Sequence, residues 1–325
     1  MDVTVIMLTY NHQPYIAQAI ESVLAQRTQA TFELIISEDH STDATRQIVT
    51  EYAQRDPERI RLLLSAKNQN DMDVYSRAYE SATGEFVAYL DGDDYWMPDK
   101  LERQVRFLRD HPDCPMCFHA VQVVGDLPQG MDYDRIGHHG DWLTIGGMVD
   151  YNHVPSCSPL FRRAALGLLP DWFDELPYCD WPIALLMAEQ GDIGYIDVTL
   201  GAYRQHAGGV WSSAPAYQQA QWDVTFFLAM RDRLERPNRV HASKGLALAR
   251  SRSILANGLA SGRRGAVQEF AASCRDVRGW DDVRYMHAPC KSLLRAVAPT
   301  LHGHLGSVAR GARRTWRRLG GRRAG

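Results

Sequence analysis

The stretch Phe86-Val-Ala-Tyr-Leu-Asp-Gly-Asp-Asp-Tyr-Trp96 joins an apolar run to three carboxylates, Asp91, Asp93 and Asp94. A short, continuous apolar run predicts a strand that is buried on both faces of a sheet. In an open α/β sheet, ligands bind at the carboxyl ends of the strands, where these acids follow. Because clustered carboxylates repel one another, folding alone gives no reason to place three together, and a divalent cation would relieve the repulsion. The alternative is a polar turn, since Asp-Gly-Asp-Asp is also good turn chemistry.

Five apolar or β-branched runs in the first 125 residues predict strands, and helical patterns alternate with them. Such alternation indicates βαβ units and a mostly parallel sheet flanked by helices, so we predict an α/β fold. Polar or acidic side chains follow the first, second and fourth runs, and we expect them to meet at one edge of the sheet. The predicted strands are 3–9, 32–37, 60–64, 86–90 and 116–124.

Capping and turn residues predict where the helices begin and end. Pro14 and Pro98 are expected to open the first and fourth helices. Ser41 or Thr42 is expected to cap the second helix, and Gly84 to close the third. Beyond a Gly-rich, irregular segment at 125–155, we expect strands at 158–162, 193–197 and 200–203 and helices at 180–188, 215–235, 241–258 and 263–274.

The composition is that of an ordinary globular protein, but the charge is unevenly distributed. The 325 residues are 45% hydrophobic and 23% charged, and six are cysteines. We expect neither a signal peptide, nor a membrane-spanning helix, nor a disulfide framework, and therefore a cytoplasmic protein. The formal charge is −3, yet 291–325 carries nine Lys and Arg and no acid, which leaves about −12 on the remainder.

Four blocks, in this order along the chain, resemble those of family 2 glycosyltransferases with the GT-A (Rossmann-like) fold. They are Thr9-Tyr10-Asn11, Glu38 to Asp43, Leu90 to Asp94 and Asp180-Trp181. The run from Asp94 to Leu101, together with Cys117-Phe-His119, makes the chain most similar to bacterial members that act on cell-surface glycans. The resemblance covers about residues 1–212, so we expect a catalytic domain there, a helical region at 213–290 and a basic tail at 291–325.

The resemblance implies that the first two blocks bind the nucleotide of a UDP-, dTDP- or GDP-linked sugar. Thr9, Tyr10 and Asn11 would border the donor, with the Tyr10 ring against the base. Asp39 would accept a hydrogen bond from the imide N–H of the base. An aromatic face and one directional acceptor together suffice to recognise a base. Tyr10 could instead be a packed aromatic residue, and Asp39 could serve only a turn.

The resemblance also implies a metal and a catalytic base. Asp93 would be the main ligand of Mn²⁺ or Mg²⁺, with Asp91 near the ribose and the metal, and the cation would bridge the diphosphate. His206 matches a region where related enzymes place a ligand for the metal or the pyrophosphate. Asp180 would take the proton from the acceptor hydroxyl in a single inverting displacement. The structural alternatives are a helix N-cap for Asp180 and an ordinary loop histidine for His206.

Three tryptophans are candidates for the acceptor side of the site: Trp96, Trp181 and Trp211. Burial in the core is the more frequent location of this residue type. Cys114, Cys117 and His119 look superficially like a zinc cluster, but a fourth ligand at suitable spacing is missing, so we expect them to pack in or beside the fifth strand.

The chain departs from the family pattern at three positions. Glu38 and His40 stand where Asp and Gly are common, so the turn before Ser41 is expected to differ. Ser76 stands where many members carry Asn, which puts donor-sugar contacts at that position in doubt.

The basic segment 291–325 has three interpretations. Its Arg residues alternate with leucines and Trp316, a pattern that favours an anionic membrane surface, where a lipid-linked acceptor would lie. Its glycines would also suit a solvated tail. Nucleic-acid binding is the third option, and we expect no nucleic-acid partner because an aromatic stacking module is absent elsewhere.

These observations favour a metal-dependent, inverting glycosyltransferase of cell-surface polysaccharide synthesis (lipopolysaccharide, capsule or a similar glycan) with a glycan or lipid-linked acceptor. One rival is a sugar-nucleotide pyrophosphorylase, which would need a Gly-rich, Arg-bearing phosphate loop where Thr9-Tyr-Asn-His12 stands. The other is a catalytically inactive relative that binds glycans or membranes as an assembly partner. Intact Asp91, Asp93 and Asp180 argue against it.

Overall fold

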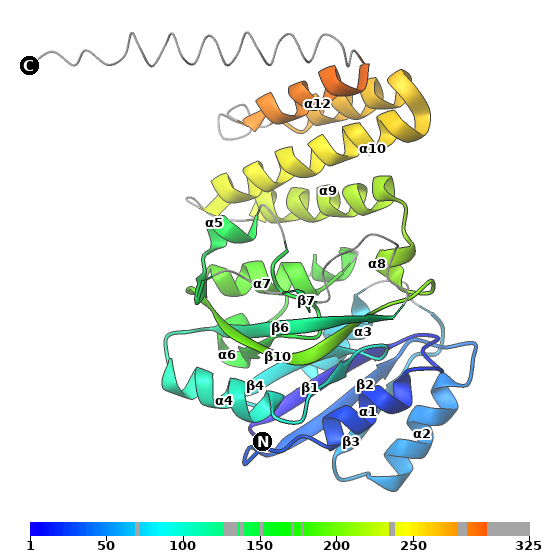
Figure 1. The fold of residues 1–325 in the computed structure, drawn as a ribbon, viewed down its shortest axis with the longest axis vertical. Helices are drawn as coiled ribbons and strands as arrows, with labels where there is room; N and C mark the ends of the chain where they lie inside the picture. The colour runs from blue at the N-terminus through cyan, green and yellow to red at the C-terminus, as the bar shows by residue number, and fades with distance from the viewer. Residues whose placement is uncertain are drawn as a thin grey trace, which may run out of the picture. The chain divides into compact units, whose positions relative to one another are not determined.

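A computed structural model describes residues 1–68, 72–125, 135–136, 140–149, 152–170, 172–176, 178–233, 238–277 and 285–297. The described chain divides into two compact units, Met1–Ser213 and a second unit that begins at Ala214. Figure 1 shows the ribbon of both.

The first unit is built on one mixed sheet whose strands follow the order β3-β2-β1-β4-β9-β6-β10-β5. Strands β1 to β4 pair in parallel, as do β6 and β10, whereas β9 lies antiparallel between β4 and β6. The α/β class and the mostly parallel sheet are therefore confirmed. The strands are β1 Val3–Thr9, β2 Phe32–Glu38, β3 Ile60–Leu64, β4 Phe86–Asp91, β5 Tyr95–Trp96, β6 Met116–Gly125, β7 Arg135–Ile136, β8 Trp142–Leu143, β9 Leu160–Arg162 and β10 Ile193–Gln205.

Helices cover both faces of this sheet (Figure 1). Alternate residues of β1 and β2, such as Met7 and Ile36, share one apolar core with the buried sides of α1, α2 and α4. On the opposite face the Ser37 hydroxyl donates to the Val74 carbonyl of α3 at 2.8 Å. Both faces of β1 and β4 are thus covered, which explains their continuous apolar runs. The helices are α1 Ile16–Leu24, α2 Thr45–Arg55, α3 Asp73–Glu80, α4 Lys100–Asp110, α5 Ile145–Met148, α6 Arg163–Leu166, α7 Asp180–Ala188 and α8 Val210–Ser213, with a 3₁₀ turn η1 at Phe173–Glu175.

Two of the predicted helix boundaries were wrong. The N-cap of α2 is Ala44, and the Thr45 amide donates to the Asp43 carboxylate at 2.9 Å, so neither Ser41 nor Thr42 caps this helix. Gly84 does not close α3, which ends at Glu80. Its backbone packs so closely on β1 that a Cβ there would lie 2.5 Å from the Thr4 nitrogen. Glycine is needed at 84 for this close approach rather than for a helix end.

The strands predicted at 193–197 and 200–203 form one long strand, β10. Register shifts between Ile196 and Gly201, where β10 pairs with β6, account for the apparent break in the sequence pattern. This strand carries the chain to Arg204 and His206 beside the acidic loop after β4.

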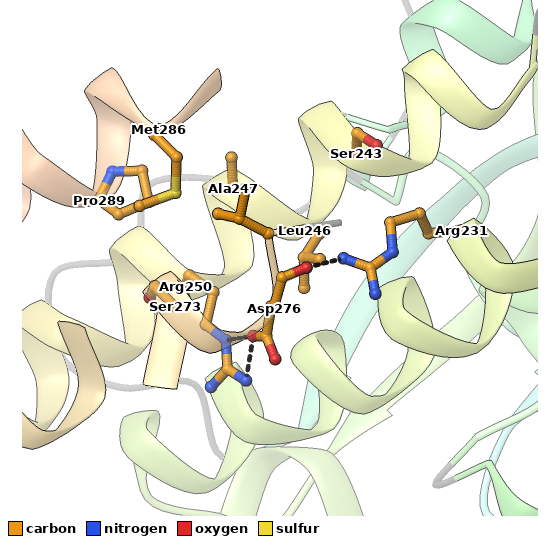
Figure 2. A pocket seen from close by; sticks show the side chains of 10 residues that line it. Arg231, Ser243, Leu246, Ala247, Arg250, Ser273, Asp276, Met286 and Pro289 are labelled. Atoms are coloured by element: carbon orange, nitrogen blue, oxygen red, sulfur yellow. Dashed lines mark hydrogen bonds and ion pairs between the residues drawn. The ribbon is translucent and has the colours of Figure 1, made fainter. Parts of the chain in front are cut away.

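The second unit contains α9 Ala216–Arg233, α10 Asn238–Arg275 and α12 His287–Val297. A kink at Gly262, where φ is +68°, divides α10 close to the break expected between 258 and 263. Figure 2 shows Arg231 and Arg250 directed at Asp276. Arg250 forms an ion pair with the Asp276 carboxylate at 2.5 Å, and Arg231 donates to the Asp276 carbonyl at 2.5 Å.

Within the described residues, every helix is too short or too polar to cross a membrane. The basic segment 291–325 lies outside the described residues from 298 onward.

Candidate active site

The loops that follow β1, β2 and β4 are joined at one edge of the sheet, as the sequence predicts. The register pairs Thr9 with Glu38 and Leu8 with Asp91, so the three strands end at the same level. Beyond the last pairs, the Asp39 amide donates to the Thr9 carbonyl at 3.0 Å. The Gly92 amide donates to the Leu8 carbonyl at 2.8 Å.

The loops after β1 and β2 are fastened to each other by side-chain hydrogen bonds. The backbone N–H of Asn11 donates to the Ser41 hydroxyl at 3.0 Å. The backbone N–H of Thr42 donates to the side-chain oxygen of Asn11 at 2.8 Å. Asn11 and His40 have positive φ values of 55° and 59°. His40 thus adopts the left-handed conformation for which a glycine is favoured.

Tyr10 and Asp39 both lie on these joined loops. Tyr10 is 39% exposed. Asp39 is 9% exposed, and its own backbone N–H makes the link to the Thr9 carbonyl. Their nucleotide-binding role stays a prediction, while the side-chain oxygen of Asn11 holds the loop after β2. Thr9 is buried and lies behind Gly92.

The three carboxylates after β4 converge on one point. One oxygen each of Asp91, Asp93 and Asp94 lies within 4.8 Å of the others. Burial, and then the charge of Asp93, raise the pKa of Asp91 to about 7. Burial, and then the charges of Asp93 and Asp91, raise the pKa of Asp94 well above its usual value. Oxygen atoms this close, with raised pKa values, fit a divalent cation, because a cation would compensate charges that the protein leaves in excess.

Asp93 differs from its neighbours because two histidines face its carboxylate. Nε2 of His206 lies 2.9 Å from Oδ2 of Asp93, and Nε2 of His12 lies 3.6 Å from the same oxygen. Burial by itself would raise the pKa of Asp93, but the hydrogen bond with His206 and the charges of both imidazoles lower it overall. Burial lowers the pKa of His12. Of the three carboxylates, Asp93 is therefore the one whose charged form the protein favours.

The sequence analysis did not identify His12 or Arg204 as site residues. The Arg204 amide donates to Asp94 Oδ1 at 2.7 Å, and its Nε donates to the Asp93 carbonyl at 2.8 Å. Its guanidinium lies over the ring of Tyr15, and this ring also packs against His206. Arg204 thus fixes the acidic loop from β10. Its only sequence signal is its place two residues before His206.

Gly92 is required by close packing within the acidic loop. A Cβ at this position would lie 2.7 Å from Oγ1 of Thr9 and 2.9 Å from Nδ1 of His12. Any larger residue would push the loop after β1 away from the carboxylates.

Asp180 begins α7 but does not cap it. The N-cap is Cys179, and the first turn contains Pro182 as expected. Nδ2 of Asn152 donates to Oδ2 of Asp180 at 2.7 Å, which orients the carboxylate. Burial and the charge of Asp93 are the larger causes of the raised pKa of Asp91, and the charge of Asp180 adds to them. Asp180 and Asp91 therefore face the same region. The helix-cap interpretation of Asp180 is wrong.

Two of the three acceptor-side tryptophans are core residues, which corrects the expectation for them. Trp96 is 3% exposed, and its indole nitrogen donates to the Cys157 carbonyl. Trp181 is 5% exposed, and its indole nitrogen donates to the Met148 carbonyl. Trp211 alone is exposed, at 41%, and its ring contacts Tyr178 edge-on. Both buried indoles have satisfied polar ends, so their role is to support the site's framework.

The remaining departures from the family pattern have structural explanations. Glu38 is fully buried, where it binds Arg46 and accepts a hydrogen bond from the Ser41 amide at 2.5 Å. The Ser76 hydroxyl donates to Asp174 at 2.5 Å. Cys114, Cys117 and His119 are buried in or beside β6, as expected.

Comparison with known proteins identifies the family. Residues 4–163 match glycosyl transferase family 2. The chain belongs to glycosyltransferase family 2. It is 32% identical over 227 residues to an uncharacterized protein of Mycobacterium tuberculosis, covering 68% of this chain and 64% of the relative. It is 36% identical over 165 residues to TuaG of Bacillus subtilis, a candidate teichuronic acid biosynthesis glycosyltransferase, covering 51% of this chain and 64% of TuaG.

Solved structures of glycosyltransferases share the fold. The S. aureus TarS 1–349 complex with UDP-GlcNAc matches with a TM-score of 0.59 at 21% identity, covering 91% of this chain and 82% of TarS 1–349. The mannosyltransferase PcManGT from Pyrobaculum calidifontis, in complex with GDP-Man and Mn²⁺, matches with a TM-score of 0.52 at 22% identity. The match covers 90% of this chain and 85% of PcManGT. The GT-A-like arrangement predicted from the sequence is confirmed. The chain spans about two thirds of the length of the two relatives matched by sequence.

Proposed function

We propose that this chain is a metal-dependent, inverting glycosyltransferase that moves a sugar from a nucleoside-diphosphate donor to a hydroxyl of a glycan or lipid-linked acceptor. The observation that carries the proposal is the excess of carboxylate at one sheet edge, where Asp91, Asp93 and Asp94 converge and Asp180 faces the same region. A divalent cation would offset this excess and could also bind the diphosphate of a donor. Family membership supports the reaction class, and the name of TuaG supports a role in cell-surface polysaccharide synthesis.

In this proposal each residue has a defined task. The Tyr10 ring packs on the base of a UDP, dTDP or GDP group, and Asp39 accepts a hydrogen bond from the base. Asp93, with Asp91 and His206, holds Mn²⁺ or Mg²⁺, and PcManGT with GDP-Man and Mn²⁺ supports this assignment. When bound, the cation acts as a Lewis acid that stabilises negative charge on the departing diphosphate.

The acceptor reacts on the other side of the donor sugar. Asp180, oriented by Asn152, takes the proton from the acceptor hydroxyl as its oxygen attacks the anomeric carbon. The bond to the diphosphate breaks as the new glycosidic bond forms. One displacement with one base inverts the anomeric carbon, so a second catalytic carboxylate is not needed.

Replacing Asp180 by Asn separates its catalytic role from a structural one. Asn keeps the shape and a hydrogen bond with Asn152 but cannot take the proton. We expect transfer to fall by roughly 10²- to 10⁴-fold while donor binding, measured by calorimetry, stays within about twofold. Asp110→Asn, at the exposed end of α4, is the matched control. An equal loss of binding and transfer would show that Asp180 is structural.

The donor class is tested by thermal denaturation against a panel of UDP-, dTDP- and GDP-sugars, with and without Mn²⁺. A ligand present at about 100 times its dissociation constant stabilises the folded state by about 2.7 kcal/mol. We expect one nucleotide class to raise the melting temperature, and Mn²⁺ to enlarge that shift. If none of these sugars raises it with metal present, the proposed function is wrong.

We also propose that the basic segment 291–325 holds the enzyme at the cytoplasmic surface of an anionic membrane, where a lipid-linked acceptor would lie. The segment carries nine Lys and Arg and no acid. Deleting 298–325 spares α12 and removes seven of these charges. We expect the deletion to weaken co-sedimentation with phosphatidylglycerol vesicles but not with neutral phosphatidylcholine vesicles. Unchanged partitioning onto both would refute the membrane role.

A further inference from the structure

The carboxylate of Asp93 lies between two imidazoles, and the family resemblance accounts for only one of them. His206 follows β10, whereas His12 lies in the loop after β1, so the two histidines come from opposite ends of the first unit's sequence. Both present Nε2 to the same oxygen of Asp93, at 2.9 Å for His206 and 3.6 Å for His12. Their ring centroids are 6.4 Å apart, and the ring planes are nearly perpendicular.

Hydrogen bonding does not explain the position of His12. Its side chain is only 15% exposed, and its buried Nδ1 has no hydrogen-bond partner among the residues that the structure describes. Its Nε2 is 3.6 Å from Asp93, which is too long for a hydrogen bond. A buried imidazole with neither nitrogen hydrogen-bonded carries a desolvation cost, so the fold alone gives no reason to bury His12.

The packing nevertheless holds His12 in place. Gly92 lies against its Nδ1, and any side chain at residue 92 would displace the ring. The fold thus brings Nε2 of His12 toward Asp93, which lies beyond hydrogen-bonding distance from it.

The distance from Asp93 to each imidazole suits a shared cation. Around an octahedral dication with bonds of about 2.1 Å, adjacent ligand atoms are about 3 Å apart. The Nε2–Oδ2 separations of 2.9 and 3.6 Å are near that value, so each imidazole lies where a ligand adjacent to Asp93 would lie.

We propose that His12 is a second imidazole ligand of the metal site, and that with His206 it makes the site prefer Mn²⁺ to Mg²⁺. The inference rests on the metal dependence in the proposed function. Mg²⁺ favours oxygen ligands and keeps its waters, whereas transition-metal dications bind imidazole nitrogen more readily. A site built only from carboxylates would lack this preference.

Pulsed electron paramagnetic resonance of Mn²⁺ counts these ligands directly. The full-length protein is loaded with Mn²⁺ and either UDP or GDP, and electron-spin-echo modulation is recorded. We expect ¹⁴N modulation from two imidazoles, together with ³¹P modulation from the diphosphate. His12→Gln and His206→Gln should each reduce the signal to one imidazole. His111→Gln, at the C-terminal end of α4, should leave it unchanged.

Metal affinity provides the second measurement. By competition titration, His12→Gln should weaken Mn²⁺ binding by at least about tenfold and Mg²⁺ binding by less than about threefold. If the spectrum of the wild-type protein shows only one imidazole, the inference is overturned. This outcome does not depend on the folding of any variant. An unchanged ratio of Mn²⁺ to Mg²⁺ affinity in His12→Gln also overturns the inference.

The two proposals fail in different ways. ³¹P modulation with a single ¹⁴N coupling would overturn the role of His12 and leave the metal–diphosphate site intact. Absence of bound Mn²⁺ with both nucleotides would overturn metal dependence itself, and with it the inference.

Discussion

Two clusters of charged residues in the described part of the chain are built on opposite principles. In the first unit, three carboxylates converge, and two histidines face the carboxylate of Asp93. In the second unit, acids and bases are matched, because the Arg250 guanidinium forms ion pairs with the carboxylates of Glu269 and Asp276. Arg231 donates to the backbone carbonyl of Asp276, and Figure 2 shows both contacts of Asp276.

The pKa shifts follow this difference. Burial would raise the pKa of Glu269, but hydrogen bonds from Tyr217, Ser253 and Gln221 and the charge of Arg250 lower it overall. At Asp91 burial and Asp93 dominate and raise the pKa to about 7. A cluster whose charges are satisfied internally stabilises the fold, whereas one left with excess charge is suited to a ligand.

The largest effect is expected from Asp93→Asn, which tests the unbalanced cluster. The substitution removes the carboxylate that the two histidines hold in its charged form, so we expect transfer to fall by roughly 10³-fold. The free energy of unfolding of the metal-free protein should change by less than about 1 kcal/mol. Transfer assays with Mn²⁺ and urea denaturation measure the two quantities. Full activity of the variant in a chelator would contradict the metal role.

The balanced cluster should respond in the opposite way. Asp276→Asn removes the carboxylate that forms an ion pair with Arg250, which we expect to lower the free energy of unfolding of the second unit by roughly 3 kcal/mol. Hydrogen exchange of the α10 amides in increasing urea reports this loss. Arg250→Met combined with Asp276→Leu should recover part of it, because both partners of the ion pair are then removed together. Loss of nucleotide binding in a folded Asp276→Asn protein would break the distinction between the clusters.

The smallest effect concerns pH. The pKa of Asp91 is about 7 in the folded protein, whereas its usual value is 3.8. Between these two pH values the folded protein therefore keeps a proton on Asp91 that the unfolded chain has released. The stability from this proton is fully present below pH 4 and is lost as the pH rises through 7. From pH 6 to 8 the metal-free protein should lose on the order of 1 kcal/mol.

Thermal denaturation of wild type and Asp91→Asn across this range checks the pH effect. The variant should have a shallower dependence, and saturating Mn²⁺ with UDP or GDP should flatten the wild-type curve, because a bound cation replaces the proton. Parallel curves for both proteins without metal would mean that Asp91 does not titrate there.

Much of this sheet edge could be predicted because its signals are local. The run that ends in Asp91 and Asp93 shows both the strand and the acids, and the parallel sheet then brings the loops of Tyr10 and Asp39 to the same edge. Asp180 was recognised from its place in the ordered set of family blocks. Its contact with Asn152, 28 residues away, was not visible in the sequence.

The errors also have a physical cause. Trp96 and Trp181 are candidates for the acceptor side in the sequence, but packing buries both in the core. Ser41 looked like a helix cap, yet its hydroxyl accepts from Asn11, 30 residues away. Neither outcome is encoded by residue type at one position.

The sequence by itself determined the alternation of strands and helices, the acidic strand end and the family, because periodicity and short motifs are short-range properties of the chain. Only the tertiary structure decided which side chains share a site. His206 reaches Asp93 across 113 residues, and His12 reaches it from the first loop. Such meetings depend on how whole strands pair and pack, so the histidines around Asp93 became visible only once the sheet was formed.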